Sequence, residues 1–242
     1  MNNRLIQEMK VPVSRCDKRG YMDMQGVFTL FMDMASEHAV EIGMGMDALL
    51  HKGLIWLAVK SRMKIHRMPQ MFSPVTATTW PAEPGRIRCD RLYKMMQGDE
   101  LLIEGKTEWA MYEPATGKLR KMENGYPKDL QVHPEIVCEG PYARIKDDFE
   151  GCEAVDIYTV KATDLDTSCH MNNVEYIKLV LGAFHSDELA QMDIAEMEIA
   201  YKNQCYEGEQ LTIRKKQIEN GYDIGIFKAD GTPGALARIV LR

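Results

Sequence analysis

Between Asp23 and about Met46, apolar residues recur at intervals of three and four, which predicts an amphipathic helix. Gly43 and Gly45 lie near its expected end, where glycine commonly follows a helix. A second helix is predicted from about Asn172 to Glu188. The positions expected on the apolar face of the first helix are Met24, Val27, Phe28, Phe31, Met34 and Ala35.

Segments typical of β-strands surround both predicted helices. One lies at 4–14, and four follow the first helix at 54–65, 74–81, 87–96 and 101–112. The second round begins at 154–162 and continues near 195–206, 209–218, 221–228 and 235–241. The sequences QGDE, PATGK, NG and ADGTPG supply turns between successive strands.

The same order of elements therefore occurs twice. An offset of 149 residues places Asp17 on Asp166 and Met22 on Met171, each in a turn before a long helix. We predict an α+β fold of two tandem units, in which a curved antiparallel sheet wraps its own central helix. The expected bounds are 1–125 for the first unit, 126–150 for a linker and 151–242 for the second unit.

Composition narrows the class of protein. The 242 residues are 45% hydrophobic and 27% charged, as in a soluble globular chain. No apolar run approaches the roughly 18–20 residues of a membrane span, and the N-terminus lacks a signal-peptide core, so we expect a cytoplasmic protein without membrane contact. A net charge of −6 argues against general nucleic-acid binding. The six cysteines lack metal-ligand spacing, so we expect free thiols and neither a metal nor an organic cofactor.

Four segments in order along the chain resemble the acyl-acyl-carrier-protein (acyl-ACP) thioesterases of plants and bacteria. They begin at DKRGYMDMQG, LIWLAVKSRM, TTWPAEPGRI and DLDTSCHMNN. The resemblance implies two hotdog domains in tandem. It also implies hydrolysis of the thioester of acyl-ACP to release free fatty acid, within fatty acid biosynthesis, with acyl-ACP as the partner and substrate. A homodimer is compatible with this organisation.

The last segment carries the family's catalytic motif, which typically reads Asp-Leu-Asp-x-Asn-x-His-Val-Asn-Asn-x-x-Tyr. Two departures concern expected catalytic positions: Ser168 stands where the family has Asn, and Gln204-Cys205 stands where it has Glu-Cys. Met171 replaces the usual Val. The matching residues are Asp164, Leu165, Asp166, His170, Asn172, Asn173 and Tyr176.

The resemblance and the chemistry of hydrolysis together assign roles. Asp166 is a candidate base or water orienter, and His170 can bind water or the carbonyl and move a proton. Ser168 and Gln204 can each hydrogen-bond a water, although Gln204 cannot act as a base. Cys205 is a nucleophile only if His170 lowers its pKa, so acid–base activation of water is favoured over a covalent route.

Substrate contacts are expected on both units. Backbone N–H groups from Met171 through Asn172 to Asn173 would polarise the thioester carbonyl at the start of the helix. The resemblance implies that the first unit lines the acyl-chain pocket, where Met32 and Met34 are candidates. Tyr21 stands opposite His170 in the repeat, so one site per chain is expected, in the second unit.

Simpler interpretations stay open for each of these residues. The turn before the second helix could serve only as a helix cap, His170 could be a core histidine, and the methionines could fill an irregular core. Three basic stretches are candidates for carrier docking, and each could instead be solvated surface charge: 118–121, 214–216 and the alternation Lys60, Arg62, Lys64. Hydrolysis of acyl-CoA or another small thioester, or acyl-thioester binding with little turnover, are the alternative functions.

Overall fold

The computed structural model describes residues 3–127 and 129–242, which form two compact units, Met1–Gly140 and Pro141–Arg242. The boundary between the units lies inside the predicted 126–150 linker. The part of that stretch that the structure describes contains no helix or strand. No helix in the described residues is long and apolar enough to cross a membrane.

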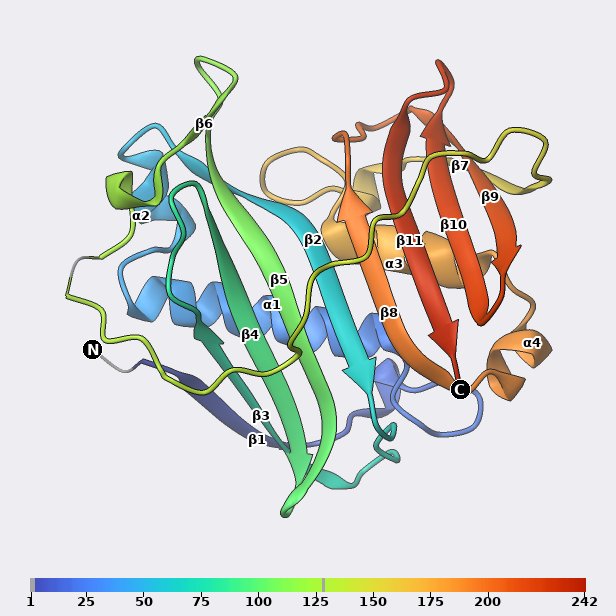
Figure 1. The fold of residues 1–242 in the computed structure, drawn as a ribbon, viewed down its shortest axis with the longest axis horizontal. Helices are drawn as coiled ribbons and strands as arrows, with labels where there is room; N and C mark the ends of the chain where they lie inside the picture. Colours follow the sequence, from blue (N-terminus) through green and yellow to red (C-terminus); the bar gives the residue numbers. More distant parts are fainter. Residues whose placement is uncertain (1–2, 128) are drawn as a thin grey trace. The chain divides into compact units, whose positions relative to one another are not determined.

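The first unit is an antiparallel sheet with one long helix on its face, α1 (Met24–Glu41) (Figure 1). Its strands follow the order β1-β3-β4-β5-β2, and β6 pairs with the far end of β5. Phe31 of α1 stacks on Tyr93 of β4 with ring centroids 4.9 Å apart, so the helix buries its apolar stripe against the sheet. The bounds are β1 Leu5–Lys10, α2 Met46–Leu50, β2 Ile55–Ile65, β3 Pro74–Pro81, β4 Arg88–Gln97, β5 Glu100–Glu113 and β6 Lys118–Arg120.

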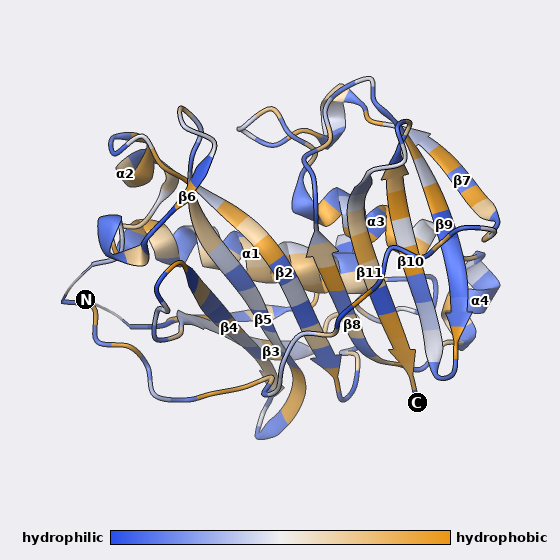
Figure 2. Cartoon of the chain, turned by 45° about the horizontal axis from the view of Figure 1, so that its top comes forward, coloured by the Kyte–Doolittle hydropathy of each residue, from blue (hydrophilic) through white to orange (hydrophobic). Residues whose placement is uncertain are grey.

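The second unit repeats this plan around α3 (Asn173–Gly182) (Figure 1). Its antiparallel strands follow the order β8-β11-β10-β9-β7. Hydrophobic and hydrophilic residues alternate along part of β8 (Figure 2), but the four consecutive residues 197–200 are all buried. The bounds are β7 Ala154–Thr159, α4 Ser186–Gln191, β8 Ile194–Tyr201, β9 Gln210–Ile218, β10 Gly221–Lys228 and β11 Pro233–Leu241. The structure confirms the predicted α+β plan of two helix-in-sheet units.

Both helices end earlier than the sequence predicted. The helix expected from Asp23 to about Met46 stops at Glu41, because Gly43 adopts φ +72° and turns the chain before the short α2. The helix expected from Asn172 to Glu188 is wrong in its second half. It ends at Gly182, and a new helix begins after His185, whose N–H donates to the carboxylate of Glu188 at 2.8 Å.

Candidate active site

A tight turn from Asp166 to His170 leads into α3. The N–H of Asp166 donates to the carbonyl of His170 at 2.8 Å, and the N–H of Cys169 donates to the carbonyl of Asp166 at 3.0 Å. The Asp166 carboxylate oxygen Oδ1 accepts the N–H groups of Ser168 at 2.8 Å and His170 at 3.4 Å. The contact between Asp166 and His170 therefore runs through the His170 backbone, and it orders the turn rather than the imidazole.

The same turn occurs in the first unit. The Asp17 N–H donates to the Tyr21 carbonyl at 2.7 Å, and Asp17 Oδ1 accepts the N–H groups of Arg19 at 2.9 Å and Tyr21 at 3.2 Å. Isolated bridges Cys16–Met22 and Leu165–Met171 close the two turns at corresponding positions. These bonds confirm the equivalence predicted at an offset of 149 residues, with Tyr21 where the second unit has His170.

A left-handed residue occupies the fourth position of each turn. Gly20 has φ +79°, a conformation that glycine adopts without steric cost, and Cys169 has φ +60°. The Cys169 side chain is exposed beside the turn. The exposed thiol of Cys169 therefore lies at a position that the first unit fills with glycine.

The start of α3 uses most of its own backbone donors. Met171 donates its N–H to the Cys205 carbonyl at 2.9 Å, and Asn172 donates to the Asp164 carbonyl at 2.8 Å. The Asn172 side chain caps the helix by accepting the N–H of Val174 at 3.1 Å. The expectation that N–H groups from Met171 to Asn173 are all free for a substrate is therefore wrong. Within the described residues, only the N–H of Asn173 has no acceptor assigned among these three.

Cys205 lies in the loop between β8 and β9 and has no exposed surface. A Cβ atom on Gly234 would stand 2.8 Å from its Sγ, so the sulfur fills space that only a glycine leaves open. Burial raises the pKa of the Cys205 thiol, and this effect outweighs the neighbouring Tyr176 phenol and Lys228. Both the geometry and the raised pKa disfavour Cys205 as a nucleophile.

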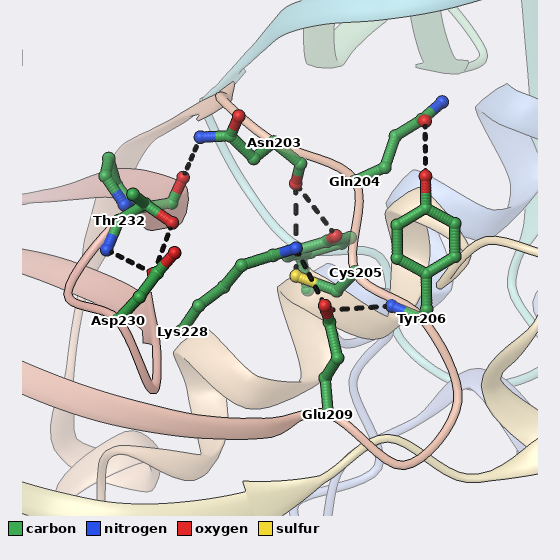
Figure 3. A network of polar contacts seen from close by, with 10 residues as sticks. Asn203, Gln204, Cys205, Tyr206, Glu209, Lys228, Asp230 and Thr232 are labelled. Atoms are coloured by element: carbon green, nitrogen blue, oxygen red, sulfur yellow. Dashed lines mark hydrogen bonds and ion pairs between the residues drawn. The ribbon is translucent and has the colours of Figure 1, made fainter.

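Tyr206 links the two remaining candidates, His170 and Gln204. Its hydroxyl donates to Gln204 Oε1 at 3.3 Å (Figure 3). Its ring meets the His170 ring edge to face with centroids 5.1 Å apart. The sequence analysis missed Tyr206. The available signal was its spacing, because a residue two positions from Gln204 in an extended loop projects to the same side.

The imidazole of His170 has no hydrogen-bond partner within residues 3–127 and 129–242, so both ring nitrogens are available to a ligand or water. Ser168 is half-buried beside it and contributes its N–H to the turn. The same described residues contain no cluster of three His, Cys, Asp or Glu side chains that could hold a metal ion. The site therefore offers the imidazole of His170, the carboxylate of Asp166 and the amide of Gln204.

The two methionines proposed for the acyl pocket lie on different sides of α1. Met34 is fully buried, whereas Met32 is half-buried and its carbonyl accepts the Ser36 hydroxyl at 3.0 Å. Positions two apart on an α-helix are separated by about 200°, so the two side chains cannot face one pocket together. A role in substrate binding stays a prediction for each.

The basic stretches proposed for carrier docking are engaged by the chain itself. Within the first unit, Arg62 and Lys64 donate to the Glu139 carbonyl at 3.5 and 3.3 Å. Within the second unit, Lys216 pairs with Asp148 at 3.0 Å, and Arg214 donates to the Cys152 carbonyl. The connecting segment thus covers part of two of the three basic stretches, which weakens the prediction that they bind a carrier.

Comparison with known families identifies the chain. A model of the acyl-ACP thioesterase N-terminal domain matches residues 2–130, and a model of the C-terminal domain matches residues 150–232. The chain belongs to the acyl-ACP thioesterase family. Its two-unit architecture matches that of solved family members, which confirms the predicted tandem hotdog fold.

This thioesterase-family chain is similar in sequence or structure to several known proteins. It is 23% identical to a chloroplastic acyl-[acyl-carrier-protein] hydrolase of Cuphea viscosissima, over 87% of this chain and 58% of that protein. The crystal structure of an acyl-ACP thioesterase from Bacteroides thetaiotaomicron matches with a TM-score of 0.89 and 21% identity, covering 100% of this chain and 98% of the other. The 12:0-ACP thioesterase from Umbellularia californica matches with a TM-score of 0.84 and 14% identity, with the same coverage. The chain spans about half the length of the curated relatives it matches.

Proposed function

We propose that this chain hydrolyses the thioester of acyl-ACP and releases a free fatty acid. One observation carries the proposal within the family: the turn before α3 presents His170 with an imidazole that no described residue hydrogen-bonds, whereas the matching turn in the first unit has Tyr21. A turn that served only to cap a helix would not need an imidazole, and the first unit shows that the turn forms with Tyr21 in that place.

Hydrolysis adds one water across the carbon–sulfur bond. The water oxygen attacks the thioester carbonyl carbon, the C–S bond breaks, and the products are a carboxylic acid and the thiol of the carrier's prosthetic arm. His170 takes the proton from the attacking water and returns a proton to the leaving sulfur. Gln204 contributes hydrogen bonds but cannot take a proton at neutral pH.

Asp166 acts at two levels in this proposal. Its Oδ1 holds the turn through the N–H groups of Ser168 and His170, which places the imidazole. Its second oxygen, Oδ2, has no hydrogen-bond donor assigned within the described part of the chain, so it can orient the attacking water. Ser168 lies in the same turn and offers one hydroxyl to that water.

The repeat supplies a matched control for the test. The variants are His170→Ala and Asp166→Asn, and the controls are Tyr21→Ala and Asp17→Asn in the equivalent turn. Asparagine keeps an oxygen that can accept the turn's N–H groups at both positions. Asp17→Asn also removes the partly exposed ion pair between Asp17 and Arg19 at 2.7 Å, a kind of contact that typically contributes little to stability. We expect His170→Ala to lower kcat for acyl-ACP hydrolysis by about 100-fold or more, and the Tyr21 variant to stay near wild type.

A second experiment compares kcat/KM for hydrolysis of the same acyl group attached to carrier protein and to CoA. A higher kcat/KM on carrier protein supports the proposal, and equal or higher values on CoA indicate a small-thioester hydrolase. No turnover on either indicates an acyl-thioester-binding protein. If Asp166→Asn and Asp17→Asn have the same effect on rate, Asp166 has only the structural role that the two turns share.

A further inference from the structure

We propose that Tyr206 is a positioning residue that orients the Gln204 amide so that its NH2 group donates to the thioester carbonyl oxygen. This inference rests on the proposed hydrolysis. It assigns a role to Gln204, which stands where the family has glutamate. Tyr206 is 45% exposed, yet its side chain and backbone make several separate contacts.

The first step is the orientation of the amide. The Tyr206 hydroxyl donates to Oε1 of Gln204, so the carbonyl end of the amide is occupied and the NH2 end points away from the phenol (Figure 3). An amide held this way is a hydrogen-bond donor toward whatever lies beyond it. A glutamate at the same position would present a second acceptor oxygen instead.

The second step is the shortage of other donors. The Met171 and Asn172 N–H groups at the start of α3 already bind carbonyls within the unit, so among the described residues only the Asn173 N–H is left at this end of the helix. Charge develops on the carbonyl oxygen during thioester hydrolysis, and preorganised donors at that oxygen stabilise it strongly. The NH2 group of Gln204 is a side-chain donor in the loop that Met171 contacts through Cys205, so it can fill this role.

The third step is that Tyr206 is itself held in place. Its N–H donates to Glu209 Oε2 at 3.0 Å, and Glu209 pairs with Lys228 at 3.0 Å. Lys228 Nζ also lies 5.5 Å from the centre of the Tyr206 ring, within the range of a cation–π contact. Figure 3 shows this set of contacts around the loop. The ring therefore has both Lys228 Nζ and the His170 imidazole as neighbours.

These contacts give Tyr206 two effects on one site. The hydroxyl sets the direction of the Gln204 amide, and the ring provides a wall for the His170 imidazole, which no described residue hydrogen-bonds. At 3.3 Å the phenol–amide bond is long for an O–H donor, so removing the hydroxyl alone costs modestly. We expect Tyr206→Phe to lower kcat by about three- to tenfold with little change in KM.

The decisive variant is Gln204→Glu. If the amide donates to the developing oxyanion, a carboxylate there repels it, and kcat falls by about 100-fold or more. If Gln204 instead stands in for a base, Gln204→Glu raises kcat and overturns the proposal. In a Gln204→Ala background, Tyr206→Phe is expected to change kcat by less than about twofold, because the hydroxyl then has no amide to orient.

Tyr222 provides a matched control. Its ring meets Phe184 edge to face at 5.0 Å and lies under Lys215 Nζ at 5.8 Å, which closely resembles the setting of Tyr206 without the catalytic neighbours. Tyr222→Phe is expected to leave kcat unchanged. A Tyr206→Phe variant as active as Tyr222→Phe, in an enzyme whose wild type hydrolyses acyl-ACP, refutes the positioning role while the proposed function stands.

A binding measurement separates the two proposals if the wild type shows no turnover. S-(2-oxoalkyl)-pantetheine keeps a carbonyl but has no thioester bond to cleave, and its Kd can be measured by calorimetry. A roughly tenfold weaker Kd in Gln204→Ala, with a smaller loss in Tyr206→Phe, supports the donor role even without hydrolysis. Equal Kd values in all three proteins overturn it.

Discussion

Replacing Cys205 by serine tests whether the thiol is a nucleophile. Its sulfur has no exposed surface and lies against Gly234, and burial raises its pKa above the ordinary value of 9.0. The thiolate is the reactive form of cysteine, and a raised pKa keeps this thiol largely protonated near neutral pH. We therefore expect Cys205→Ser to retain kcat for acyl-ACP hydrolysis within about threefold of wild type.

The same change has a predictable cost in stability. A hydroxyl placed in a largely apolar site costs about 1–3 kcal/mol when its hydrogen bonding is incomplete, although the Asn203 carbonyl, 3.9 Å from Sγ, offers one acceptor. In a chain of this size, each kcal/mol lowers Tm by about 2–4 °C. Thermal unfolding followed by circular dichroism measures this loss independently of the kinetics.

Chemical labelling provides the control within one molecule. Cys169 is exposed and Cys205 is buried, so iodoacetamide should modify Cys169 first in the native protein. Cys169→Ser is the matched variant and should also keep its activity. A loss of 100-fold or more in Cys205→Ser with a native circular dichroism spectrum would refute the reasoning. So would an acyl adduct on Cys205 in a rapidly quenched reaction.

Two further predictions concern stability. Arg91 Nη1 lies 3.0 Å from His38 Nδ1, and both side chains are buried. His38→Leu should therefore lower the free energy of unfolding by about 3–5 kcal/mol, because it removes this partner of a buried cation, and Arg91→Met should lower it clearly less. Urea unfolding that ranks the two variants in the opposite order contradicts this prediction. Partial burial raises the pKa of Glu135, but hydrogen bonds and charge attraction from Lys94 and His133 together outweigh it and hold that pKa below the ordinary 4.5. The stability that this carboxylate contributes is thus present above about pH 4.5 and is lost as the pH falls through the folded-state pKa. Between about pH 5 and pH 3, the urea midpoint of Glu135→Gln should therefore drop less than that of wild type. An equal drop in the two proteins contradicts the assignment.

Local patterns were sufficient to predict the repeated architecture. Helical spacing from Asp23 onward predicted α1, and the offset of 149 residues predicted that Asp17 and Asp166 form the same turn, because an aspartate that accepts nearby N–H groups is a local structure. The ends of the helices were harder to predict. The second helix stops at Gly182, and a new helix begins at a capping box formed by His185 and Glu188. The same two residues would also fit within one continuous helix, so the sequence alone does not predict the break.

The sequence by itself determined the fold class, the family and the turn that carries Asp166 and His170, since these depend on spacing along a short stretch of chain. Only the tertiary structure decided which groups in that turn remain available. Met171 donates its N–H to the carbonyl of Cys205, so this N–H is not available to a substrate. Cys205 is buried against Gly234, which lies in strand β11. Hydrogen-bond partners and burial depend on segments far apart in sequence, so spacing alone cannot predict them.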